Sequence, residues 1–170
     1  MSAPLIMGFL NQCQAASLQP QFFTETQGKL VAEIAELIIP TTDTPGAKAA
    51  LVDRFIDLIL LECYEENDRK RFVEGLDQLE KACQQAHSKP FVNCEVAIQT
   101  ALLKQFEQEA WEVMYTSGEP HFFSMMKELT LLGYFSSEIG ATQAVRYVPI
   151  PGNYLACIPL EPGQKAWATM

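Results

Sequence analysis

The sequence lacks the signals of several common protein classes. It has two histidines, no Gly-x-Gly-x-x-Gly turn, no phosphate-binding loop and no Gly-x-Ser-x-Gly nucleophile turn. Basic residues are also few, since 12 lysines and arginines stand against 21 aspartates and glutamates, for a net charge of -9. Nucleic acid and anionic lipid surfaces are therefore unfavourable partners. No run approaches the roughly 20 apolar residues of a membrane-spanning helix, so we expect no direct membrane span.

Close cysteine pairs are absent too. Five cysteines are present, but none has the short spacing that zinc sites and redox motifs use. If residues 51–67 and 70–87 form an antiparallel helical hairpin, Cys63 and Cys83 are separated by roughly 16 Å along its axis, which is too far for a disulfide. Cys83 and Cys94 flank the next turn and could meet. A disulfide between them needs an oxidising compartment, and buried free thiols are the alternative.

Helical periodicity is what the sequence does contain. Apolar residues make up 48% of the chain and charged residues 19%, which is typical of a folded globular protein. The pattern predicts an all-α fold, a helical bundle of about five main helices followed by an irregular, proline-rich C-terminal arm. The expected helices are residues 24–39, 49–66 and 68–86, one capped by Asn93, one between Pro120 and Gly133, and a short one at 137–144.

Local signals predict the ends of these helices. Thr24 can accept from the first free amides while Gln27 bonds back to it, which forms a capping box. Asn93 can cap the fourth helix, and Gly133 is a natural stop for the fifth. The fifth helix is apolar nearly all round, so we expect it at the centre of the bundle. The polar loop 41–47 is either a connector between helices or a binding loop.

The chain divides into three expected regions. Residues 1–20 combine an apolar stretch with small residues, and we expect them to be the remnant of an export signal or a flexible leader. Residues 21–145 form the helical bundle, and residues 146–170 form the extended arm. Four prolines between Val148 and Pro162 forbid a long helix there. The arm is nevertheless too apolar to hang free in water, so it packs on the bundle or on a partner.

No arrangement of side chains indicates a catalytic site. Neither His87 nor His121 has a second histidine or a carboxylate one turn away that would present a metal site. Carboxylate pairs such as Glu65 and Glu66 are typical of a solvated helix face. We therefore predict no catalytic, cofactor-binding or metal-binding residue in this chain. The alternative is an enzyme or a small-ligand-binding helical protein, using loop 41–47.

A series of short motifs follows in a fixed order between residues 21 and 167. The motifs are Phe22-Phe23-Thr24, Leu37-Ile38-Ile39-Pro40, Thr42-Asp43-Thr44-Pro45-Gly46-Ala47, Phe55-Ile56-Asp57, Gly133-Tyr134-Phe135, Ser137-Glu138-Ile139-Gly140 and Pro151-Gly152-Asn153-Tyr154. Their order and spacing resemble the gluconate 2-dehydrogenase subunit 3 family.

The resemblance implies a non-catalytic small subunit of a membrane-associated flavoprotein dehydrogenase for a sugar or sugar acid. In that family a large subunit carries FAD and a cytochrome c subunit accepts the electrons, so FAD and haem c are expected in partner subunits. The small subunit assists the maturation of the large one and its twin-arginine export, which implies a periplasmic or cell-envelope location. Residues 2–16 resemble the end of the leader with which family members begin, without its arginine pair. A stand-alone envelope protein that has lost its partner is the alternative.

The apolar arm suits an interaction subunit, because proline-rich extended segments lose little entropy on docking. We predict that a set of aromatic, aliphatic and proline residues in and before the arm contacts the large subunit. The alternative is that these residues seal the protein's own helices. The set is Tyr134, Phe135, Tyr147, Pro149, Ile150, Pro151 and Tyr154.

Overall fold

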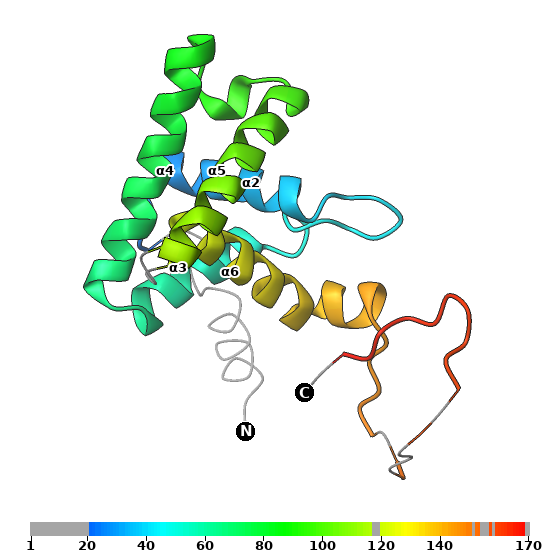
Figure 1. Ribbon diagram of the computed structural model, residues 1–170. Coiled ribbons are helices and arrows are strands. Elements are labelled where there is room, and N and C mark those ends of the chain that lie inside the picture. Colours follow the sequence, from blue (N-terminus) through cyan, green and yellow to red (C-terminus); the bar gives the residue numbers. More distant parts are fainter. Residues whose placement is uncertain (1–20, 117–119, 151, 154–156, 158, 169–170) are drawn as a thin grey trace, which may run out of the picture.

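The computed structural model describes residues 21–168, apart from 117–119, 151, 154–156 and 158. The described residues form five α-helices and two short helical turns, which confirms the predicted all-α bundle. The helices are α2 (Glu25–Ile38), α3 (Val52–Cys63), α4 (Glu66–His87), α5 (Val96–Thr116) and α6 (Phe122–Ser136), with the turns η1 (Phe91–Asn93) and η2 (Gly140–Ala144). Helix α6 packs against α2, α3, α4 and α5, so the expected central position of the fifth helix is confirmed (Figure 1).

Two sets of hydrogen bonds fix the segment that leads into α2. The predicted capping box is confirmed, since the Thr24 hydroxyl accepts from the backbone N–H of Gln27 and the Gln27 side chain accepts from that of Thr24. Just before it, the backbone N–H groups of residues 21–23 donate to the carboxylate of Asp57 in α3. The Phe23 side chain is thereby held in the core.

The starts of α3 and α5 differ from the prediction. Helix α3 begins three residues later than expected, because Leu51 adopts a left-handed conformation with φ of 53°. Asn93 does not cap α5, because it lies within η1, and α5 begins only at residue 96. The backbone of Phe91 explains this turn. Its N–H donates to the carboxylate of Glu80, and its carbonyl accepts from the side-chain amide of Gln99.

The predicted stop at Gly133 is wrong. Helix α6 continues through Gly133 to residue 136. A Cβ atom at Gly133 would lie 2.6 Å from Cδ1 of Phe55, so the glycine lets α3 and α6 approach closely. The glycine therefore serves packing between two helices and not the end of one.

The described residues of the C-terminal arm, which lie between 146 and 168, project away from the five helices, beyond the end of α6 (Figure 1). Its two ends pair with each other in a parallel bridge between Arg146 and Trp167. The Arg146 N–H donates to the carbonyl of Ala166 at 2.7 Å, and its guanidinium lies 4.3 Å from the centre of the Trp167 ring. The segment between these ends is thus a loop closed at its base. Among the described helices, none has the length and apolar character that crossing a bilayer requires.

Candidate partner-binding surface

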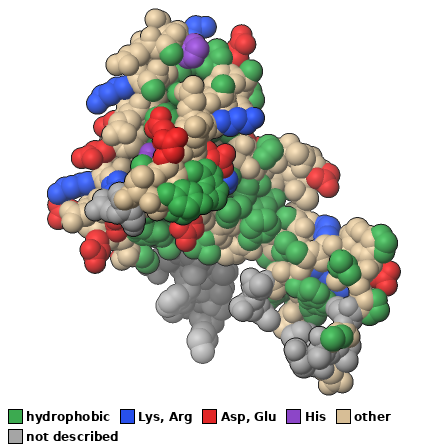
Figure 2. Space-filling model, in the orientation of Figure 1, with side chains coloured by type: hydrophobic (Ala, Val, Ile, Leu, Met, Phe, Trp, Pro, Cys, Tyr) green, Lys and Arg blue, Asp and Glu red, His purple; other side chains and the backbone are tan. Residues whose placement is uncertain are grey.

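An open apolar groove runs between α5 and α6, and we call it the α5–α6 groove. Its volume is about 300 Å³. The side chains of Trp111, Met114 and Leu131 in its wall are 55%, 53% and 41% exposed. Hydrophobic side chains also gather over α5 and α6 in the space-filling view (Figure 2). The lining residues are Glu107, Ala110, Trp111, Met114, Phe123, Ser124, Lys127, Glu128 and Leu131.

Helical spacing brings these residues together. On α5 the lining positions are 107, 110, 111 and 114, which share one face of a helix. On α6 they are 123, 124, 127, 128 and 131, which share the facing side. Leu132 and Phe135 continue the exposed apolar surface along α6 towards its end. The two helices thus leave one apolar stripe open to solvent.

One ion pair crosses between the two walls of the groove. Lys127 of α6 forms an ion pair with Glu107 of α5. Both side chains also line a second hollow of about 200 Å³, whose apolar wall includes Leu37 and Leu103. An exposed pair of this kind contributes little to stability.

An aromatic pair stands at one wall of the groove. Trp111 and Tyr115 are one helical turn apart, and their rings stack with centroids 6.4 Å apart. Tyr115 is 79% exposed. Exposed tryptophan and tyrosine are the side chains that most often anchor protein interfaces. Trp111, Met114 and Leu131 were not in the predicted contact set. The signal that indicates them is that apolar residues cover more of α5 and α6 than one core-facing stripe.

Tyr134, from the predicted contact set, lies in the core. Its side chain is 1% exposed. Its hydroxyl donates to the carbonyl of Pro45 at 2.7 Å, which ties α6 to loop 41–47. The ring packs edge-on against Phe135, with centroids 5.3 Å apart. Tyr134 therefore offers no surface to a partner in this structure, whereas Phe135 does.

The other predicted contact residues are on the arm. Tyr147 is half-exposed, and Pro149 and Ile150 are exposed. Pro151 and Tyr154 lie outside the described residues.

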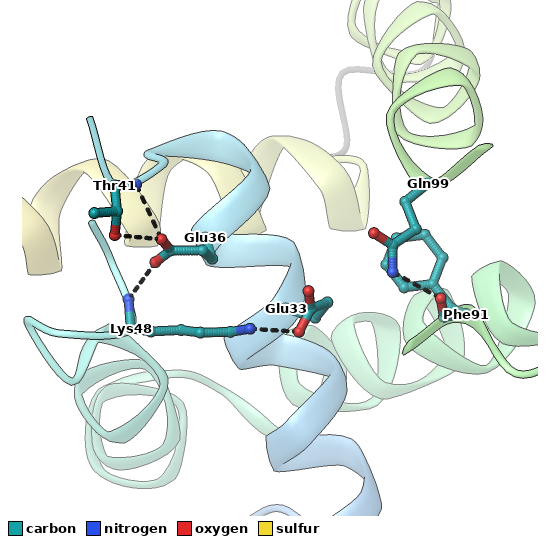
Figure 3. A network of polar contacts seen from close by, with 6 residues as sticks. All are labelled: Glu33, Glu36, Thr41, Lys48, Phe91 and Gln99. Carbon is teal, nitrogen blue, oxygen red and sulfur yellow. Dashed lines mark hydrogen bonds and ion pairs between the residues drawn. The ribbon is translucent and has the colours of Figure 1, made fainter. Parts of the chain in front are cut away.

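Loop 41–47 is fastened to α2. One carboxylate oxygen of Glu36 accepts from the N–H and hydroxyl of Thr41, and the other accepts from the N–H of Lys48, whose ammonium pairs with Glu33 (Figure 3). Burial opposes ionisation of Glu36, but these hydrogen bonds outweigh it and lower the pKa of the carboxyl. A Cβ at Gly46 would lie 2.4 Å from this carboxylate. These contacts favour the connector interpretation of the loop.

Both histidines lie at helix ends. His121 caps α6, since its Nδ1 accepts from the N–H of Phe123 at 3.2 Å. Burial lowers the pKa of His121, which favours the neutral ring that this bond needs. His87 is the last residue of α4. Within the part of the chain that the structure describes, no cluster of His, Cys, Asp or Glu could hold a metal ion.

The sulfur atoms of Cys83 and Cys94, the pair considered for a disulfide, lie 3.1 Å apart. Cys63 and Cys157 are exposed thiols. Cys13 lies outside the described residues.

Comparison with known families identifies the chain. The model of the family gluconate 2-dehydrogenase subunit 3 matches residues 25–152, well over half of the 170 residues. The match spans all five α-helices, the α5–α6 groove and the first residues of the arm. Searches of curated proteins and of solved structures give no match. The chain belongs to the gluconate 2-dehydrogenase subunit 3 family.

Proposed function

We propose that this chain is the non-catalytic small subunit of a flavoprotein gluconate or sugar dehydrogenase complex and that it binds the large FAD-bearing subunit. Family membership supports this role. In the complex, FAD belongs to the large subunit and haem c to a cytochrome c subunit where one takes part. The chain assists maturation and export of the large subunit, and the complex functions in the periplasm or at the cell envelope.

The exposed α5–α6 groove is the observation that carries the proposal. Contiguous exposed apolar surface marks interaction sites, because each Å² left in water forgoes about 25 cal/mol. Family membership supports the FAD-bearing subunit as its occupant. The lining has two glutamates against one lysine, and the whole chain has a net charge of -9. The matching surface of the large subunit therefore presents apolar side chains with a neutral or basic border.

The C-terminal arm supplies a second contact in this proposal. Arg146 and Trp167 close the loop at its base, so less chain entropy is lost when the loop docks than for a free tail. Tyr134 is left out because it is buried. The proposed contact residues are Phe135, Tyr147, Pro149, Ile150, Pro151 and Tyr154.

Co-purification tests the proposal. A tagged FAD-dependent dehydrogenase subunit from the same organism is co-expressed with the chain, with its Trp111→Ala variant, and with a chain that ends at Val145. Truncating an aromatic anchor costs about 2 kcal/mol, so we expect Trp111→Ala to bind about 30-fold more weakly. Leu58→Ala is the matched control, because Leu58 is 50% exposed but lies on α3.

Failure of the wild-type chain to bind the dehydrogenase subunit would contradict the proposal. Binding of Trp111→Ala that is as tight as that of Leu58→Ala would contradict the groove as the contact. If only the chain ending at Val145 loses binding, the arm and not the groove is the contact. If the purified chain instead carries a small ligand and binds no dehydrogenase, the small-ligand-binding alternative replaces the proposal.

A further inference from the structure

The connection between α4 and α5 brings two thiols into contact. Cys83 lies in the last part of α4 and is fully buried, and Cys94 follows η1 and is half-buried. Their sulfur atoms are 3.1 Å apart. A disulfide has an S–S length of about 2.05 Å, so the sulfurs need to approach by only about 1 Å.

Contacts that do not involve sulfur hold this geometry. Ser88 ends α4 in a left-handed conformation with φ of 55°, which turns the chain back. Phe91 is buried, its N–H donates to Glu80 at 3.1 Å, and its carbonyl accepts from Gln99 at 2.8 Å. These bonds join the connection to α4 on one side and α5 on the other. Cys94 is therefore presented to Cys83 before any bond forms.

The other described cysteines are not placed to form a disulfide with Cys83. Cys63 is the last residue of α3 and precedes the first turn of α4, whereas Cys83 is near the far end of α4. At 1.5 Å per residue, roughly 25 Å of helix separates the start of α4 from Cys83. Cys157 is on the arm, which projects away from the helices (Figure 1).

The geometry points to an intrachain disulfide between Cys83 and Cys94 that covalently ties the end of α4 to the start of α5. The bond goes beyond the proposed function, since it does not depend on whether the dehydrogenase subunit binds. It fixes the N-terminal approach to α5, the helix that carries Trp111 of the groove.

The chemistry assigns an order to the two thiols. Cys94 is the more accessible one, so its thiolate attacks the disulfide of an external oxidised dithiol and releases one thiol of that oxidant. Cys83 then attacks Sγ of Cys94, and its proton goes to the second departing thiolate. Two electrons and two protons pass from the pair to the oxidant. The products are the protein disulfide and the reduced dithiol.

The electrostatics of Cys83 favour a structural bond over a labile one. Burial and the neighbouring Cys94 sulfur raise the pKa of Cys83 to about 12. Easily reduced disulfides are those whose reduced form is stabilised by a low thiol pKa. The environment of Cys83 does the opposite, because it leaves the thiolate unstabilised.

Peptide mapping tests the bond directly. The full chain is made in an oxidising compartment, quenched in acid, and its free thiols are alkylated before digestion. Trypsin leaves both cysteines in one peptide, residues 82–104, because Pro90 follows Lys89 and blocks cleavage. We expect this peptide to carry no alkyl group and to have a mass two hydrogens below that of its dithiol form. Cys63 and Cys157 should be alkylated. Recovery of the peptide with both cysteines alkylated, or linked to another cysteine, overturns the inference.

A stability measurement gives the second readout. For a loop of this length, reducing the bond with dithiothreitol should lower Tm by about 5 to 10 °C. Cys94→Ser should abolish this reductant-dependent shift, and the matched control Cys63→Ser, at an exposed thiol, should keep it. A Cys94→Ser protein with the full shift refutes the inference. If that variant does not fold, the peptide map of the wild-type chain decides.

Discussion

Replacing Asp57 by Asn should loosen the segment that leads into α2. The carboxylate is 4% exposed and accepts from the N–H groups of Gln21 at 2.7 Å, Phe22 at 3.1 Å and Phe23 at 2.7 Å. A hydrogen bond to a charged group contributes about 1.5–3 kcal/mol. The amide of Asn keeps one acceptor oxygen but turns an NH₂ group towards a backbone donor. We therefore expect the free energy of unfolding to fall by about 2–4 kcal/mol.

Urea denaturation followed by circular dichroism measures this change. Asp77→Asn is the control, because Asp77 is exposed on α4 and should change the free energy of unfolding by less than about 0.5 kcal/mol. Hydrogen exchange adds a local readout, in which the amide of Phe23 should lose protection in Asp57→Asn. If Asp57→Asn is as stable as Asp77→Asn and Phe23 stays protected, the anchoring role of this carboxylate is refuted.

Three further predictions concern the polar contacts of α2 and α5. Gln99→Leu should lower the free energy of unfolding by about 1–3 kcal/mol in urea, because it leaves the carbonyl of Phe91 buried without a donor, and no loss would contradict that role. Gly46→Ala should cost about 1–3 kcal/mol in the same assay, because its Cβ displaces the Glu36 carboxylate, and full stability would refute this steric argument. The pKa of Glu36 is lowered below 4.5, so its contribution to stability is present above pH 4.5 and is lost as pH falls through the lowered value. Glu36→Gln should therefore show a weaker loss of stability on acidification below pH 4.5, and an unchanged pH profile would contradict this assignment.

Local signals predicted most of the fold. Apolar spacing alone indicated each of the main helices, and Thr24 with Gln27 marked the start of α2 correctly because a capping box depends only on neighbours in the chain. The errors arose where distant residues decide. The sequence predicts a helix stop at Gly133, but the ring of Phe55 in α3 fills the space that the glycine leaves. The sequence predicts a cap at Asn93, but the hydrogen bonds of Phe91 to two helices impose a turn there.

The partner-binding surface was harder to predict than the helices. Tyr134 and Phe135 are adjacent and both aromatic, yet one is buried against loop 41–47 and the other is half-exposed. The α5–α6 groove depends on which apolar stripe the packing of α6 leaves open, and helical periodicity does not distinguish a core stripe from a solvent stripe. Trp111 shows this difficulty. It lies on the flank of α5, and only the packing that places Leu131 across the groove indicates that Trp111 lines an apolar surface.

The most direct test of a non-catalytic, partner-binding role is dye-linked oxidation of gluconate and related sugars by the purified chain, alone and with the FAD-dependent dehydrogenase subunit. The isolated chain should show no flavin or haem absorbance and no turnover, and activity should elute only in fractions that contain the FAD-dependent subunit. Turnover by the chain alone, or a redox group bound to it after purification, would contradict that role.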